Sequence, residues 1–178
     1  MSNIILIGMR GTGKSALGKK LAEKLGWKFI DADTCIVQEA GKEIKDIVEE
    51  KGWEYFRSLE KKIITDISCK DKYVIATGGG AIMDDENVKN LKRNNIVVLL
   101  TTDLNLIAER IGRHDRRPSL TGKLSATEEV EKIWKERKDR YFSTANITFD
   151  TSRTSRNKEA NLKQKAKDLI RLLKKFGI

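Results

Sequence analysis

Short apolar runs alternate along the chain with longer segments whose apolar positions recur every third or fourth residue. The runs that predict strands lie at 4–7, 28–31, 73–76, 96–100 and 147–150. Short runs with few polar positions are typical of strands buried in a parallel sheet. Because strand-like and helix-like segments alternate, the pattern predicts an α/β fold. We expect a three-layer αβα sandwich around a five-stranded parallel sheet, with right-handed crossovers.

The helical segments follow from the same periodicity. They are expected directly after residue 15, over 43–51, 53–70, 103–111 and 125–142, and from 158 to the end of the chain. Gly52 separates two of them, because glycine interrupts a helical pattern.

The residues between the first strand and the first helix, Gly8 to Ser15, read Gly-x-x-x-x-Gly-Lys-Ser. This is the Walker A pattern of a P-loop NTPase fold in its strand–loop–helix context. Glycines let the backbone approach a phosphate, and the loop N–H groups attract the anion. Lys14 is expected to reach the β- and γ-phosphates, and the Ser15 hydroxyl to ligate Mg²⁺. The residues expected to bind ATP here are Gly11, Thr12, Gly13, Lys14, Ser15 and Ala16. A glycine-rich turn with a chance lysine does not explain the full pattern in this context.

Two acids, Asp31 and Asp33, come at the end of the second strand. Ligands gather at the carboxyl ends of parallel strands. One carboxylate would help to hold Mg²⁺ through water, and the other would accept a proton from a substrate hydroxyl. The alternative for Asp33 is an N-cap of the helix that follows it.

Two further groups of residues are candidates for a second substrate. Gly78, Gly79 and Gly80 follow the third strand, where bare backbone lets a ligand approach; the alternative is a flexible loop. Arg57 and Glu60 are either a surface ion pair or an arginine held in position to grip an anion. The third strand lacks the terminal acid of a Walker B motif, which argues against motor ATPases and helicases.

The segment 112–122 is polar, begins and ends with glycine and carries the chain's single proline. This composition predicts a mobile loop. Its arginines would close over the γ-phosphate and neutralise charge in the transition state. A solvated basic loop is the alternative.

Composition is typical of a soluble globular protein rather than a disordered one. With 178 residues, 39% hydrophobic and 35% charged, it is expected to form one domain over 1–178. No apolar run approaches the length of a membrane span, and the first strand leaves no room for a signal peptide. Cys35 and Cys69 have neither metal nor redox spacing, so a cytoplasmic enzyme is expected. His114 is the single histidine, and no triad is built around it.

The formal net charge of +10 fits two kinds of partner. It suits either nucleic acid or small anionic substrates such as ATP. Much of the excess lies in the last helix, where a solvated face is the favoured interpretation.

The motifs together resemble those of the shikimate kinases, in the nucleoside-monophosphate-kinase-like branch of P-loop proteins. The resemblance spans roughly residues 3–152 and is carried by an ordered series of motifs. The series is Gly8 to Ser15, Asp31-x-Asp33, Phe56-Arg57-x-x-Glu60, Gly78 to Gly80, Arg117-Pro118-x-Leu120, and Arg137 four residues before Tyr141. Walker A alone is shared by many enzymes, whereas the whole series is far more specific.

The resemblance implies strand order 2-3-1-4-5, a substrate-binding region near 32–60 and a lid near 112–124. It also implies ATP-dependent phosphorylation of the shikimate 3-hydroxyl, giving shikimate 3-phosphate and ADP on the route to chorismate and aromatic amino acids. The implied cofactor is one Mg²⁺ ion. The implied enzyme is a monomer whose partners are ATP and shikimate, without nucleic acid or membrane.

The resemblance also implies a role for each matching residue. Lys14, Asp33 and Arg117 are the implied catalytic residues, Asp33 as the base and Arg117 as the lid arginine at the transferring phosphate. The residues implied to bind shikimate are Asp33, Arg57, Gly78, Gly79, Gly80 and Arg137, the two arginines through its carboxylate. Ser15 and Asp31 are the implied metal-site residues. Arg110 and Arg153 are the candidate adenine contacts. The loop after Asp150 departs from the family here, because it lacks the proline often found at that place.

Two other functions compete with this interpretation. A gluconate or nucleoside-monophosphate kinase would share the fold, but the acid, arginine and glycine motifs argue against both. A basic ATP-binding module acting on nucleic acid would explain the charge equally well. The missing Walker B acid and the low aromatic content of 6% argue against that module.

Overall fold

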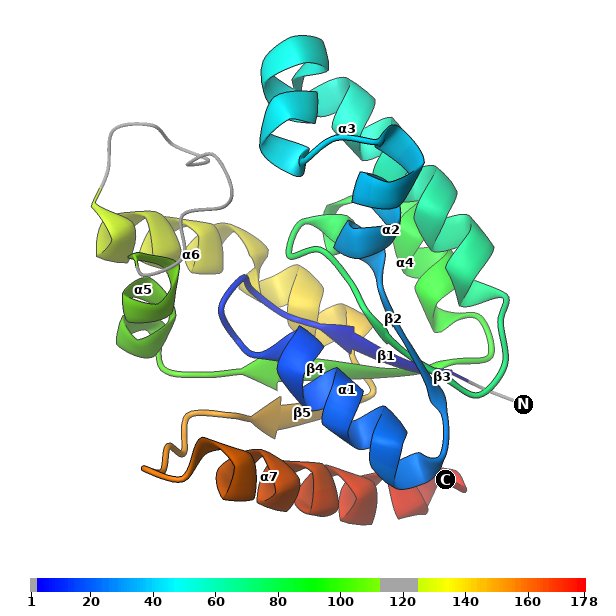
Figure 1. The fold of residues 1–178 in the computed structure, drawn as a ribbon, viewed down its shortest axis with the longest axis vertical. Coiled ribbons are helices and arrows are strands. Elements are labelled where there is room, and N and C mark those ends of the chain that lie inside the picture. Colours follow the sequence, from blue (N-terminus) through cyan, green and yellow to red (C-terminus); the bar gives the residue numbers. More distant parts are fainter. Residues whose placement is uncertain (1–2, 113–124) are drawn as a thin grey trace.

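The structure is a computed structural model that describes residues 3–112 and 125–178. Its centre is a five-stranded sheet in the order β2-β3-β1-β4-β5, and all of the strand pairs are parallel (Figure 1). The strands are β1 (Ile4–Ile7), β2 (Lys28–Asp31), β3 (Tyr73–Ala76), β4 (Ile96–Thr101) and β5 (Ile147–Asp150). The predicted fold class and strand order are confirmed.

The register aligns the carboxyl ends of the strands along one edge of the sheet. Asp31 pairs with Ala76, which directly precedes Thr77 and the three glycines. At the other side of the sheet Thr101 pairs with Asp150. The loops that carry the predicted site residues therefore leave the sheet at the same edge, as expected for a parallel sheet.

Helices cover both faces of this sheet. The helices are α1 (Lys14–Leu25), α2 (Ala32–Ala40), α3 (Ile44–Ser68), α4 (Asp85–Lys92), α5 (Leu104–Gly112), α6 (Ala126–Thr144) and α7 (Lys158–Leu173), with short 3₁₀ turns at Ala81–Met83 and Lys174–Phe176. In Figure 1, α1 and α7 lie together on one face, and their apolar sides share one core cluster with Ile4 and Leu6 of β1. Ile5 and Ile7 point to the opposite face, since side chains alternate along a strand.

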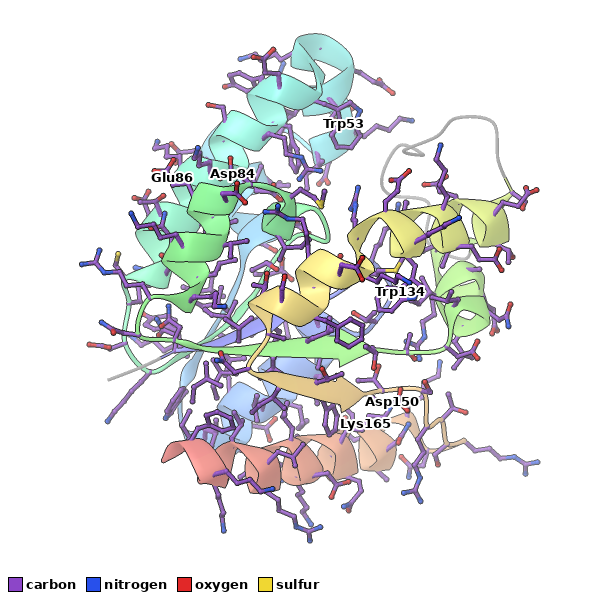
Figure 2. All side chains as sticks on the ribbon, turned by 180° about the vertical axis from the view of Figure 1, so that it is seen from behind. Trp53, Asp84, Glu86, Trp134, Asp150 and Lys165 are labelled. Carbon is purple, nitrogen blue, oxygen red and sulfur yellow. The ribbon has the colours of Figure 1, made fainter. Side chains whose placement is uncertain are left out.

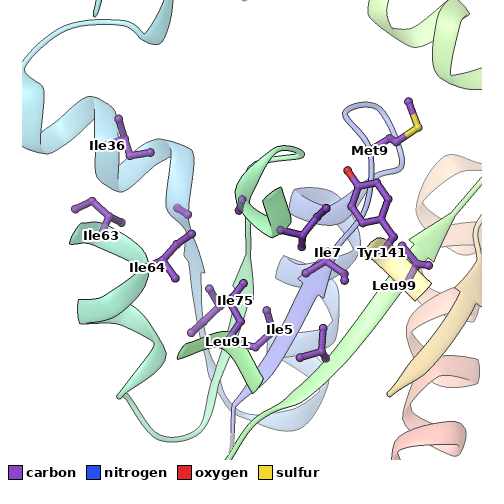
Figure 3. Close-up of a cluster of buried hydrophobic side chains, with 14 of the residues drawn as sticks. Ile5, Ile7, Met9, Ile36, Ile63, Ile64, Ile75, Leu91, Leu99 and Tyr141 are labelled. Carbon is purple, nitrogen blue, oxygen red and sulfur yellow. The ribbon is translucent and has the colours of Figure 1, made fainter. Parts of the chain in front are cut away.

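The second core cluster is shown in Figure 3. It joins α2, α3, α4, α5 and α6 to the other face of the sheet, with Ile64, Ile75 and Leu91 fully buried. At its site end lies Tyr141, whose ring is part of the same buried cluster as Met9 of the loop after β1 and Leu99 of β4. The core therefore extends directly beneath the loops at the carboxyl edge.

Of two local predictions, one is confirmed and the other is wrong. The expected break at Gly52 is confirmed, because Gly52 has φ 80° and ψ 170° inside α3. The alternative of Asp33 as a helix N-cap is wrong. Asp31 is the N-cap of α2, and its carboxylate accepts a hydrogen bond from the Asp33 N–H at 3.1 Å. Asp31 has the extended backbone that an N-cap needs, whereas Asp33 already lies in the first helical turn.

Across residues 3–112 and 125–178, none of the helices combines the length and the apolar character that crossing a membrane would require.

Candidate functional site

The loop between β1 and α1 has the backbone that its glycines predict. Gly8, Gly11 and Gly13 have φ values of 141°, 83° and 91°. These values lie in a region that other residues rarely adopt. A side chain at Gly8 would also overlap the carbonyl oxygen of Leu100 in β4. The loop thus needs glycine both for its turn and for its close packing on the sheet.

Lys14 is the first residue of α1, and its side chain turns back over this loop. The Lys14 Nζ donates hydrogen bonds to the carbonyl oxygens of Gly8 and Met9, both at 2.8 Å. Lys14 is buried, although it is charged. The Thr12 hydroxyl donates to the same Met9 oxygen at 2.8 Å. The ammonium is therefore held against the loop backbone, and a phosphate bound by the loop N–H groups would also meet this cation.

The two predicted metal-site residues lie in direct contact. The Ser15 hydroxyl donates to Asp31 Oδ2 at 2.5 Å, which joins the start of α1 to the end of β2. In the described part of the chain, no three His, Cys, Asp or Glu side chains gather as a metal cage. Mg²⁺ typically binds through one or two protein oxygens plus phosphates and water. One hydroxyl and one carboxylate beside a phosphate loop fit that ion.

Across from this loop, the three glycines lie against charged side chains. A Cβ atom on Gly78 would lie 2.6 Å from Glu60 Oε1 and 3.1 Å from Asp33 Oδ1. A Cβ atom on Gly80 would lie 2.8 Å from Cζ of Arg57. These positions therefore require glycine for close approach, and the acid and the arginine predicted for the second substrate border the same backbone.

Arg57 is held on several sides. Its Nη1 donates to Glu60 Oε2 at 2.5 Å, and the Glu60 side chain is only 1% exposed, against 36% for Arg57. The guanidinium also lies over the rings of Trp53 and Phe56, at 5.6 and 5.1 Å from their centroids. Of the two interpretations of this pair, the structure favours an arginine held in position, with its outer side open to an anion.

Arg137 and Tyr141 bring α6 to the same glycines. Tyr141 donates to the Gly79 carbonyl oxygen at 2.5 Å, and Arg137 Nη1 donates to that oxygen at 3.3 Å. Burial raises the pKa of the Tyr141 phenol to about 12, opposed by the charges of Arg137 and Arg57. Tyr141 also stacks on Trp134, with ring centroids 6.2 Å apart. A neutral, fixed phenol therefore holds the Gly79 peptide.

A cavity of about 810 Å³ runs along the carboxyl edge. Its walls include the phosphate loop from Arg10 to Leu17, together with Asp33, Thr77 and Gly79. At the far end it is lined by Leu106, Glu109, Arg110, Ile111, Thr151, Thr154, Ser155, Lys158, Asn161, Leu162 and Lys165. A ligand in this cavity would extend from Asp33 across the phosphate loop to α5 and α7.

Of the two predicted adenine contacts, Arg110 lines this cavity and Arg153 does not. Arg110 lines it and donates from Nη1 to the Gly11 carbonyl oxygen at 2.7 Å. Arg153 is exposed and is not among the described residues that line the cavity. Arg117, the predicted lid arginine, lies outside the described residues, as does nearly all of the predicted lid at 112–124.

The structure adds site residues that the sequence did not reveal. Thr151 and Lys165 line the far end of the cavity, and Lys165 donates to the Thr151 carbonyl oxygen at 2.7 Å. Lys165 lies in the basic last helix, where nothing in the local sequence separates it from its exposed neighbours.

Comparison with known proteins agrees with this geometry. The family model described as "Shikimate kinase" matches residues 10–173. The chain belongs to the shikimate kinase family. The shikimate kinase of Persephonella marina is 42% identical over 151 residues, which cover 85% of this chain and 90% of that protein. The shikimate kinase of Caldanaerobacter subterraneus is 34% identical over 96% of this chain and 95% of its own length.

Solved shikimate kinases have the same fold. The structure of shikimate kinase from Acinetobacter baumannii in complex with shikimate matches with a TM-score of 0.89 and 32% identity, over 97% of this chain and 93% of that one. Shikimate kinase from Aquifex aeolicus matches with a TM-score of 0.81 and 29% identity, over 99% and 98%. The predicted family, fold and enzyme class, a kinase that transfers a phosphoryl group, are confirmed.

Proposed function

We propose that this shikimate kinase family member transfers the γ-phosphoryl group of ATP to the 3-hydroxyl of shikimate. The products would be ADP and shikimate 3-phosphate, on the route to chorismate. The observation that carries the proposal is the shared sheet edge. There the phosphate loop, the Ser15–Asp31 pair and the Asp33–Arg57–glycine group border one another in a chain of this family.

The nucleotide side follows from the loop geometry. The loop N–H groups and the Lys14 ammonium would hold the β- and γ-phosphates and offset charge as the phosphoryl group moves. Ser15 and Asp31 would hold Mg²⁺, which supplies charge neutralisation between the phosphates. Their direct contact at 2.5 Å means that one ion can engage both oxygens, either directly or through a water molecule.

The acceptor side follows from charge complementarity. Shikimate carries one carboxylate and several hydroxyls, and the guanidinium groups of Arg57 and Arg137 both border the glycine backbone, at Gly80 and Gly79. Asp33 would accept the proton of the attacking hydroxyl, since its Oδ1 borders Gly78 and its residue also lines the nucleotide cavity. Positioning and charge neutralisation are the main requirements of phosphoryl transfer, and these residues supply both.

We also propose the remaining features expected from the sequence. They are the role of Arg117, lid closure over 112–124, the substrate-binding region near 32–60, the single domain, a monomeric state, and a cytoplasmic location without nucleic acid or membrane partners.

A substrate panel with matched variants tests the proposed function. Shikimate, gluconate and a nucleoside monophosphate are compared as acceptors under Mg²⁺-ATP, with phosphorylated product identified by mass spectrometry. We expect product with shikimate alone. Asp33→Asn should remove most turnover while ADP still binds, because the amide keeps the size of the side chain but accepts no proton. Preference for gluconate or a nucleotide, or near-normal turnover by Asp33→Asn, would contradict the proposal.

A further inference from the structure

Helix α7 reaches the nucleotide cavity through the side chain of Lys165. The neighbouring basic residues Lys163 and Lys167 are exposed, whereas Lys165 is partly buried and lines the cavity. Figure 2 labels Lys165 next to Asp150, where β5 ends beside α7. Its Nζ donates to the Thr151 carbonyl oxygen at 2.7 Å. One lysine of the basic helix therefore faces the interior of the site.

Thr151 links this lysine to the phosphate loop. The Thr151 side chain is almost fully buried, and its hydroxyl lies 2.9 Å from the carbonyl oxygens of both Thr12 and Thr101. The Thr151 N–H donates to the same Thr101 oxygen at 2.8 Å. Thr151 thus joins three elements at one point: the phosphate loop, the end of β4 and, through Lys165, helix α7.

The surroundings of the Lys165 ammonium act on its pKa in opposite directions. Burial lowers the pKa of the Lys165 ammonium and the Arg110 charge lowers it further, while Asp150 opposes both effects. Arg110 itself donates to the Gly11 carbonyl oxygen of the phosphate loop. Arg110 and Lys165 therefore both line the cavity, and each donates to a backbone carbonyl oxygen of a loop in its wall.

We propose that Lys165 is a positioning residue for the nucleoside end of ATP, acting through the segment that begins at Thr151. This inference rests on the proposed function. Thr154 and Ser155 of that segment line the cavity and belong to no helix or strand. The start of that segment is fixed by Thr151 and its hydrogen-bond partners. A segment that is already ordered loses less conformational entropy when the ligand binds, which favours binding.

The geometry limits the effect to one substrate. Asp33 and Arg57 lie on α2 and α3, whereas Lys165 lies on α7 and donates to Thr151. Loss of Lys165 should therefore weaken nucleotide binding and leave the acid substrate and the chemical step unchanged.

Calorimetric titration with ADP tests the inference, using Lys165→Met, Lys165→Arg and the exposed control Lys167→Met. Loss of a charged hydrogen bond to Thr151 should weaken ADP binding about tenfold in Lys165→Met. Lys165→Arg, which keeps a charged donor of similar reach, should restore most of the affinity, and Lys167→Met should match the wild type. Steady-state kinetics should show a higher KM for ATP with kcat and the KM for shikimate unchanged.

A second variant removes a hydrogen bond of Thr151 rather than of Lys165. Thr151→Val removes the hydroxyl bridge and should show the same rise in the ATP KM alone. Unchanged ADP affinity in Lys165→Met would overturn the inference, as would equal rises in both KM values. Failure of the proposed function would give a different result. The variants would still differ in ADP affinity as expected, but shikimate would not be phosphorylated.

Discussion

The substitution Gly80→Ala is expected to displace the Arg57 side chain while the fold stays intact. Gly80 has φ −101° and ψ −2°, a region with negative φ that alanine can adopt, so the change does not require a glycine-only backbone. The new methyl group would lie 2.8 Å from Cζ and Nη1 of Arg57 and closer still to Nη2. Ordinary contact begins at 3.4 Å. The guanidinium, which is partly exposed, must move away from the glycine backbone.

The size of the effect follows from this displacement. The guanidinium must shift by roughly 1 Å, a misplacement that is sufficient to lower the rate about 100-fold when it affects a reacting geometry. Loss of one charged contact to the shikimate carboxylate alone corresponds to about 2 kcal/mol, or about 30-fold. We therefore expect the KM for shikimate to rise about 10- to 100-fold, with the KM for ATP nearly unchanged.

A double-mutant cycle with Arg57→Ala gives the decisive control. Steady-state kinetics are measured for each single variant and for the double variant. If Gly80→Ala acts by displacing Arg57, it should have little further effect once Arg57 is alanine, because contacting residues are not additive. Additive losses, or a similar rise in the ATP KM, would refute the proposed link between Gly80 and the arginine.

Three further predictions concern other parts of the structure. Gly18→Ala places a methyl group 2.5 Å from Phe29 Cε2. Chemical denaturation should show a loss of about 1 kcal/mol in the free energy of unfolding with normal KM values, and an unchanged free energy would contradict the expected overlap with Phe29. Asp31→Asn keeps an N-cap but removes the charge beside Ser15; the Mg²⁺ concentration at half-maximal activity should rise at least roughly tenfold, and an unchanged Mg²⁺ titration would remove Asp31 from the metal site. Tyr141 has a folded-state pKa of about 12, above its unfolded value, so its contribution to the free energy of unfolding is complete below pH 10 and is lost as pH rises toward 12. This loss of roughly 3 kcal/mol should be absent in Tyr141→Phe, and parallel curves of unfolding free energy against pH for the two proteins would contradict the assigned pKa.

Much of the fold could be predicted from the sequence because its strands are short, apolar and buried on both faces. Val97, Val98 and Leu99 show no alternation, and each is fully buried between helices. The order of the strands could not be predicted in this way, because local patterns do not specify which strand lies beside which. That order came from the family resemblance.

Helix α4 was not predicted. Its sequence, from Asp85 to Lys92, is mainly polar and offers few apolar positions for a periodic pattern. The helix is instead fixed by its N-cap, since the Asp84 carboxylate accepts hydrogen bonds from the N–H groups of Glu86 and Asn87. Leu91 then anchors it in the core.

The candidate site was predictable where chemistry is encoded in local motifs. Lys14, Ser15 and the three glycines could be assigned because their spacing is specific. Lys165 could not, because its direction toward the cavity depends on how α7 packs against α1 and the end of β5. The N-cap role of Asp31 was missed because α2 begins at Ala32, directly after β2, and the local sequence does not show that the helix starts there.

The most direct test of the central claim is a coupled assay of ADP release with Mg²⁺-ATP, with and without shikimate. The account predicts slow release from ATP alone and strong stimulation by shikimate, with one phosphorylated shikimate formed per ADP. No stimulation in a protein that still binds ADP would contradict the proposed substrate and leave only the P-loop kinase fold and its nucleotide site.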